Sequence, residues 1–200
     1  SEMCIRDRVI KEDKVSFIKD ISGLNYRLAG EVIGAANEVV PMILKGGGIK
    51  NTLIISPPGA GKTTMLRDIV RQLSYKSYRV SVVDERSEIA ALCEGRSAFD
   101  LGFSTDVLEG VDKAEGMLMV LRSMSPDVIV TDEIGKQSDI DAIERITNSG
   151  AGVIATIHGR NIDMIKRRDD LKRMLKFFGL IITLSKRKGI GTVEEALTEW

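Results

Sequence analysis

The sequence predicts an α/β protein built on a mostly parallel sheet. From residue 49 to the end of the chain, short apolar segments of strand length alternate with amphipathic segments of about a dozen residues. A strand, a helix and the next parallel strand form one crossover unit, and a series of such units builds a parallel sheet with flanking helices. A glycine-rich turn after the first strand and a pair of acids after a later strand place candidate chemistry at the carboxyl edge of that sheet.

The elements are expected in alternating order. The expected strands are residues 52–55, 79–84, 127–133, 151–158 and 180–187, with a further hairpin strand within 188–197. The expected helices are residues 63–74, 113–124 and 138–150, followed by a basic helical segment over 162–178. Residues 85–110 form a polar connecting stretch.

One boundary is expected, at the glycine run Gly46–Gly48. Before it, residues 27–45 carry apolar residues at mixed helical spacing, and Pro41 predicts a kink or a restart of that helix. The first eight residues, SEMCIRDR, resemble a translated sequencing adapter, so we expect them not to be native. The predicted organisation is an N-terminal segment over residues 1–48 and a main domain over residues 49–200.

The composition excludes several classes of function. The 29 basic residues balance the 29 acidic residues, so the formal charge of zero predicts no overall attraction to nucleic acid or to an anionic membrane. The longest apolar stretches are far shorter than the roughly 20 residues of a membrane-spanning helix, and we find no signal peptide. With two distant cysteines and a single histidine, the sequence predicts no zinc site.

The turn SPPGAGKTT, residues 56–64, differs at one position from the phosphate-binding loop, whose motif is Gly, four residues, then Gly-Lys-Ser/Thr. Ser56 replaces the first glycine, but serine is small and tolerates turn geometry, so we expect nucleotide to bind. Lys62 is expected to reach the β- and γ-phosphates, and Thr63 to place its hydroxyl on Mg²⁺. The expected nucleotide-binding residues are Ser56, Pro57, Pro58, Gly59, Ala60, Gly61, Lys62, Thr63 and Thr64.

A second candidate feature is the acid pair that ends the strand DVIVTDE, residues 127–133. Alone, such a pair is often only a solvated turn, but together with the phosphate-binding loop it indicates a catalytic site. Asp132 would contact the metal through its water shell. Glu133 would polarise the attacking water as a general base. Arg122, shortly before this strand, is a weaker candidate for contact with the γ-phosphate or a neighbouring subunit.

Two more strand ends point to the same edge of the sheet. The stretch VVDERSE places Asp84, Glu85 and Arg86 after the second strand, as helpers of the metal, the water or a phosphate, or simply as a charged loop. The stretch VIATIHG ends the fourth strand with Thr156 and His158, where a polar side chain can sense the γ-phosphate.

Four stretches carry a resemblance to a known family: SPPGAGKTTMLRDIVRQLS, VVDERSEIAA, KAEGMLMVLRSMSPDVIVTDEIG and GVIATIHG. From about Ile21 to Leu197 the chain resembles the stage III sporulation protein AA family. These are ATPases of the secretion superfamily, related to the motors of type II and type IV secretion and of pilus retraction. The resemblance assigns Lys62 and Thr63 to the phosphate-binding loop, Asp132 and Glu133 to the metal and water acids, Asp84 and Glu85 to an acidic box, and His158 to a histidine box.

The resemblance also implies a fold, cofactors and partners. It implies a RecA-like domain that uses ATP and Mg²⁺ and works as a homo-oligomer, a hexameric ring, with membrane proteins of a sporulation channel complex. The implied location is the mother-cell cytoplasm, at the inner face of the membrane. The family has an N-terminal domain that packs over the nucleotide, and only its last segment is expected in residues 1–48.

Alternatives to an ATP-hydrolysing motor stay open. An assembly scaffold would bind ATP and barely hydrolyse it, although a water-polarising Glu133 argues against this. A RecA-like ATPase dependent on nucleic acid would want basic grooves and stacking rings, whereas aromatic residues make up only 4% of the chain. A small-molecule kinase is the weakest alternative, since no segment reads clearly as a lid that bears arginine.

Overall fold

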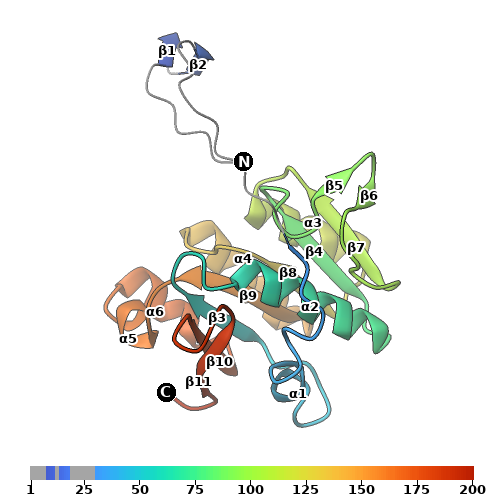
Figure 1. Cartoon of the computed structure of the whole chain (residues 1–200), viewed down its shortest axis with the longest axis vertical. Helices are drawn as coiled ribbons and strands as arrows, with labels where there is room; N and C mark the ends of the chain where they lie inside the picture. The colour runs from blue at the N-terminus through green and yellow to red at the C-terminus, as the bar shows by residue number, and fades with distance from the viewer. Residues whose placement is uncertain (1–7, 12–13, 19–29) are drawn as a thin grey trace. The chain divides into compact units, whose positions relative to one another are not determined.

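The structure is a computed structural model that describes residues 8–11, 14–18 and 30–200 (Figure 1). The chain divides into two units, Ser1–Gly30 and Glu31–Trp200. In the first unit, β1 (Arg8–Lys11) pairs antiparallel with β2 (Lys14–Ile18). Of the eight residues expected not to be native, residues 1–7 lie outside the described part.

The described part of the second unit is built on a seven-stranded sheet in the order β11-β10-β3-β9-β8-β4-β7. Its strands are β3 (Thr52–Ser56), β4 (Val80–Asp84), β7 (Thr105–Glu109), β8 (Val128–Thr131), β9 (Gly152–His158), β10 (Leu180–Ser185) and β11 (Thr192–Leu197). Every neighbouring pair is parallel except β10 and β11. The predicted α/β class with a mostly parallel sheet is confirmed.

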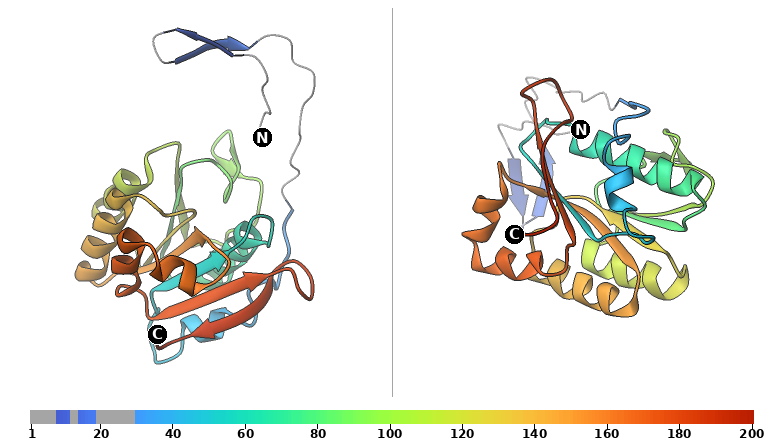
Figure 2. Two further views of the ribbon diagram at one scale, coloured as in Figure 1. Left: turned by 90° about the vertical axis from the view of Figure 1, so that its left-hand side faces the viewer. Right: turned by 90° about the horizontal axis from the view of Figure 1, so that it is seen from below.

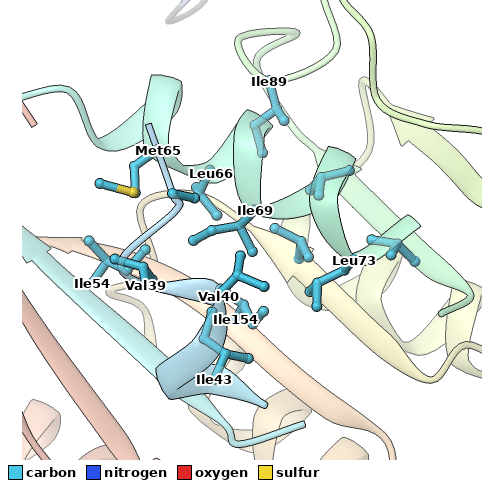
Figure 3. Close-up of a cluster of buried hydrophobic side chains, with 14 of the residues drawn as sticks. Val39, Val40, Ile43, Ile54, Met65, Leu66, Ile69, Leu73, Ile89 and Ile154 are labelled. Atoms are coloured by element: carbon cyan, nitrogen blue, oxygen red, sulfur yellow. The ribbon is translucent and has the colours of Figure 1, made fainter. Parts of the chain in front are cut away.

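Helices cover both faces of this sheet (Figure 2). One face carries α1 (Val40–Ile43) and α2 (Lys62–Tyr75). The other carries α3 (Lys113–Ser123), α4 (Gln137–Ser149), α5 (Ile162–Lys166) and α6 (Asp169–Leu175). Each face has its own apolar cluster. In the cluster of Figure 3, Ile69 and Leu73 of α2 lie with Val40 and Ile43 of α1 near Ile154 of the sheet. None of the helices in the described residues combines the length and the apolar character that crossing a membrane requires.

The long helix predicted over residues 27–45 is wrong for its described part, which begins at residue 30. Gly34 has a left-handed backbone, with φ of +89°, and interrupts a helix there. The amides of Ala35, Asn37 and Val39 each bond to the carbonyl three residues back, so the segment forms successive tight turns. The predicted restart is confirmed, because Pro41 lies in the first turn of α1.

The basic segment 162–178 is two short helices rather than one. Its buried apolar residues are Ile162 and Ile165 in α5, Leu171, Met174 and Leu175 in α6, and Phe178 after α6. The six-residue step from Ile165 to Leu171 breaks the spacing of three or four that one apolar helix face requires. The segment therefore forms two helices, α5 and α6, and each buries its own set of apolar residues.

The connecting stretch 85–110 contains strands that the sequence analysis did not find. β7 joins the edge of the main sheet beside β4, and β5 (Leu92–Cys93) pairs with β6 (Arg96–Ser97) in a small hairpin. At the sheet's edge, β7 is only half buried and includes an exposed Asp106, so it lacks the apolar run that marks the central strands.

A buried carboxylate on α2 holds the turn segment that precedes α1. Asp68 of α2 is 3% exposed and accepts hydrogen bonds from the amide of Ala36 at 2.8 Å, from Arg71 Nε at 2.8 Å and from Gln72 Nε2 at 2.8 Å. Burial raises the pKa of Asp68, but these hydrogen bonds outweigh it and hold the pKa below its ordinary value.

We expect Asp68→Asn to lower the free energy of unfolding by about 1–3 kcal/mol at pH 7, because an NH2 group replaces one of the two oxygens that accept from these donors. Since the folded pKa is depressed, this stabilisation is complete above the unfolded pKa of about 4 and disappears as the pH falls through the folded value. Urea titrations at several pH values should show the difference shrinking in acid. Asp106→Asn, an exposed change on β7, is the control and should leave stability unchanged; an equal loss in both variants would contradict the assignment.

Candidate nucleotide site

The predicted site residues follow the carboxyl ends of four neighbouring strands. Because β3, β9, β8 and β4 are parallel, the segments after Ser56, His158, Thr131 and Asp84 lie at one edge of the sheet. In the register of β3 and β9, Ser56 stands opposite His158. This arrangement brings segments that are far apart in the chain to a common edge.

The phosphate-binding loop starts directly from the sheet. Ser56 is the last residue of β3, is fully buried, and donates from Oγ to the carbonyl of Pro57 at 2.9 Å. Left-handed backbone occurs further along, at Gly59 (φ +69°) and Gly61 (φ +90°), and not at Ser56. The conformation at residue 56 therefore does not require glycine.

The loop ends in a helix terminus that is open to an anion. Gly61 is the N-cap of α2 and offers no side chain to the first amides, and the first turn of the helix has no acidic residue. Free amides together with the positive end of the helix dipole favour a phosphate group. Lys62, the first helical residue, is 8% exposed and adds a cation. These residues fit the phosphates of a nucleotide.

The carboxylate of Glu133 lies at the centre of the site and is contacted by three cationic or basic groups. Lys62 Nζ bonds to Oε1 in a short ion pair. His158 Nε2 lies 2.9 Å from the same oxygen, and Arg86 Nη1 lies 3.2 Å from Oε2. The structure thus brings together four residues that the sequence analysis had singled out on four separate segments.

This contact changes the protonation behaviour of Glu133. Burial raises its pKa, but the hydrogen bond and charge of Lys62 and the charges of His158 and Arg86 outweigh burial, so the pKa of Glu133 lies below its ordinary value. The group is therefore an ionised carboxylate at neutral pH, the form that a general base requires.

The backbone holds Glu133 in an unusual conformation. Its φ of +42° is left-handed, a region that non-glycine residues seldom occupy. The Glu133 amide donates to Thr156 Oγ1 at 2.9 Å, and the amide of Ile134 donates to the Thr156 carbonyl at 2.9 Å. Thr156 therefore fixes the turn after β8, and its hydroxyl is engaged with the backbone rather than facing a ligand.

Asp132 is the candidate metal ligand. Its side chain is 1% exposed, and Oδ2 has no hydrogen-bond partner among the described residues. Burial raises the pKa of Asp132, and the charge of Lys113, whose Nζ lies 3.9 Å from Oδ1, opposes that rise. The described residues contain no cluster of three or more His, Cys, Asp or Glu suited to a metal. One free carboxylate oxygen beside a phosphate loop still fits Mg²⁺, which keeps most of its waters.

The two acids after β4 have different environments. Asp84 is fully buried and accepts from the amides of Glu88, Ile89 and Ala90 at 2.8–2.9 Å, so it shapes the following loop. Glu85 is half exposed and lies 3.5 Å from Lys113 Nζ. Of the two, only Glu85 is open toward the edge of the site.

Two basic residues of the site were missed by the sequence analysis. Lys113 begins α3, is 5% exposed, and donates to the carbonyl of Glu133 at 3.1 Å while also facing Glu85 and Asp132. Arg67 of α2 donates to the carbonyls of Ile89 and Glu88 at 2.7 and 2.6 Å, which joins the phosphate-loop helix to the loop after β4. Both lie in stretches that carry the family resemblance, Arg67 in SPPGAGKTTMLRDIVRQLS and Lys113 in KAEGMLMVLRSMSPDVIVTDEIG, but no local pattern assigned either of them a role.

Arg122 does not reach this site within its own chain. It is exposed in the last turn of α3, whereas Lys113 at the other end of that helix faces the acids. This position does not support contact with the γ-phosphate within the same chain, and the predicted contact with a neighbouring subunit stays a prediction.

Comparisons with known proteins identify a matching family. The family model described as "Sporulation stage III, protein AA" matches residues 3–199. The chain is 40% identical over 196 residues to stage III sporulation protein AA of Bacillus subtilis (strain 168), across 94% of this chain and 64% of that protein. The chain thus spans less than two thirds of that relative's length.

Solved structures show the same fold. The ATPase DotB of Legionella pneumophila superposes with a TM-score of 0.53 at 22% identity, covering 67% of this chain and 40% of that one. The VirB11 ATPase from the Brucella suis type IV secretion system, in complex with sulphate, superposes with a TM-score of 0.56 at 14% identity, covering 81% and 50%. The fold is that of the P-loop secretion ATPases, as the resemblance implied.

We expect Lys113→Met to lower the free energy of unfolding by about 3 kcal/mol, because it leaves the buried Asp132 without its nearest cation. Lys136→Met is the matched control, since Lys136 also faces Glu85, at 3.9 Å, but its side chain is 62% exposed. Urea denaturation of both variants measures the difference. Equal stability of the two variants would show that Lys113 does not support the acid pair.

Proposed function

The chain belongs to the family of sporulation stage III, protein AA, and from this premise we propose that it binds and hydrolyses Mg-ATP. The fold it shares with the secretion ATPases DotB and VirB11 supports a nucleotide-dependent role. The observation on which the proposal rests is the grouping of Lys62, His158 and Arg86 on the carboxylate of Glu133 at the mouth of the phosphate-binding loop.

In the proposed reaction, the cationic groups that contact Glu133 release it and bind the phosphates of ATP instead. Lys62 moves from Glu133 to the β- and γ-phosphates, which leaves the carboxylate free to orient a water and accept its proton. The water oxygen attacks the γ-phosphorus, and the bond to the oxygen bridging the β- and γ-phosphates breaks. Glu133 later returns the proton to solvent, and Glu85 and His158 assist by placing the water and contacting the γ-phosphate.

The metal site in this proposal consists of Thr63 and Asp132. Thr63 would bring its hydroxyl to Mg²⁺, and Asp132 would use the Oδ2 atom that has no partner among the described residues. A bound ion would neutralise negative charge on the phosphates. Within the protein, the charge of Lys113 opposes the rise that burial causes in the pKa of Asp132.

We propose that the chain acts as a motor subunit of a secretion-like apparatus assembled during endospore formation. The Bacillus subtilis relative is named a stage III sporulation protein, and the VirB11 ATPase comes from a type IV secretion system. The proposed assembly is a hexameric ring that meets membrane proteins of a channel complex at the inner face of the mother-cell membrane. Residues 49–200 would be its ATPase domain and residues 1–48 an N-terminal segment.

A second candidate, an ATP-binding scaffold with little turnover, is favoured by one observation. Lys62 and Glu133 form an ion pair with each other in this structure, so Lys62 is not free to bind a phosphate and Glu133 is not free to bind a water. If nucleotide does not separate this pair, the protein would bind ATP without hydrolysing it.

The proposal is tested by ATP binding and hydrolysis over a range of protein concentrations. We expect turnover to rise more than linearly with concentration, Lys62→Ala to abolish binding, and Glu133→Gln to keep binding while losing at least about a hundredfold in rate. Glu144→Gln, an exposed change on α4, is the control and should behave as the wild type. Binding with background hydrolysis in the wild type would favour the scaffold, and no binding would refute both candidates.

A further inference from the structure

The loop between β10 and β11, residues 186–191, lies against the phosphate-binding loop (Figure 2). The amide of Gly191 donates to the carbonyl of Ala60 at 3.0 Å. A Cβ atom placed on Gly61 would lie 2.9 Å from Ile190 Cγ2 and 3.2 Å from the amide nitrogen of Gly191. Both this close contact and its positive φ therefore require glycine at position 61. The loop 186–191 and the phosphate-binding loop are in direct contact.

Lys186 places its ammonium group beside Gly59 of the phosphate-binding loop. A Cβ atom on Gly59 would lie 3.0 Å from Lys186 Nζ and 3.6 Å from Cε, so the end of the lysine side chain occupies the space that a side chain at position 59 would take. No carboxylate of the described residues lies within ion-pair distance of Lys186. The neighbouring Arg187, in contrast, pairs with Glu194 at 3.0 Å.

The start of the phosphate-binding loop offers few backbone hydrogen-bond donors. Pro57 and Pro58 follow Ser56 and have no backbone N–H, so two amides that the start of such a loop would offer are absent. A cation beside Gly59 supplies positive charge next to the positions where those donors are missing. The loop after β10 also has the support to hold it, because Ser185 Oγ donates to Glu194 Oε2 at 2.9 Å and accepts from the Arg187 amide at 3.2 Å.

We propose that Lys186 is a second phosphate-binding lysine, which approaches the polyphosphate of ATP beside Gly59 and compensates for the two prolines. This inference rests on the proposed nucleotide site. It adds a binding residue from the loop between β10 and β11. Lys186 binds the ligand electrostatically and takes no part in proton transfer.

The test compares the affinity for ATP and for inorganic triphosphate of the full chain with that of Lys186→Ala, Lys186→Arg and Lys188→Ala. We expect Lys186→Ala to weaken both ligands about tenfold, more at low salt, because a charge-assisted contact is lost. Lys186→Arg should recover most of the affinity. Lys188→Ala, an exposed change in the same loop, should remain within about twofold of the wild type. Thermal unfolding without ligand checks that each variant folds.

Each outcome separates the two proposals. If the wild type binds ATP, Lys62→Ala abolishes binding and Lys186→Ala binds like the wild type, the role of Lys186 is wrong while the nucleotide site stands. If Lys188→Ala loses as much as Lys186→Ala, the effect is general loop charge and the specific role is wrong. If the wild type binds neither ATP nor triphosphate, both the nucleotide site and the role of Lys186 are wrong.

Discussion

The contact between the Glu133 carboxylate and Lys62 is the interaction on which the rest of the site depends. Lys62 comes from the helix after β3, and Glu133 from the turn after β8, so the pair joins the phosphate-binding half of the edge to the acidic half. The Nε2 atom of His158, from β9, lies 2.9 Å from the same carboxylate oxygen of Glu133. Because β3, β9 and β8 are neighbours, the order of strands in the sheet is what makes this meeting geometrically possible.

The surroundings of this pair link it to the sheet on both sides. Thr156 holds the left-handed turn at Glu133, and Lys113 binds the carbonyl of that same residue from the start of α3. On the other side, Arg67 donates hydrogen bonds to backbone carbonyls of the loop after β4. Asp84 accepts hydrogen bonds from backbone amides of the same loop. A ligand that separates Lys62 from Glu133 would therefore act on groups that are hydrogen-bonded to neighbouring strands and helices.

Much of this arrangement could be predicted from the sequence, and the failures have physical causes. The strand-turn-helix context of Lys62 and the acids after DVIVT identified the edge of the site, because local patterns determine those elements. Lys113 and Lys186 were not predicted, since each becomes relevant only through tertiary packing. In the described part of the segment 27–45, no helix forms before α1 because Gly34 interrupts it, and the apolar residues there pack on α2 through turns instead.

The most direct test of the central claim is a crystal structure of the chain with Mg²⁺ and a non-hydrolysable ATP analogue. The account predicts that Lys62 Nζ leaves Glu133 and contacts the phosphates, that Lys186 lies on the same phosphates, and that Glu133 faces a water near the γ-phosphate. A structure in which the analogue is bound at this edge but Lys62 still pairs with Glu133 would contradict it.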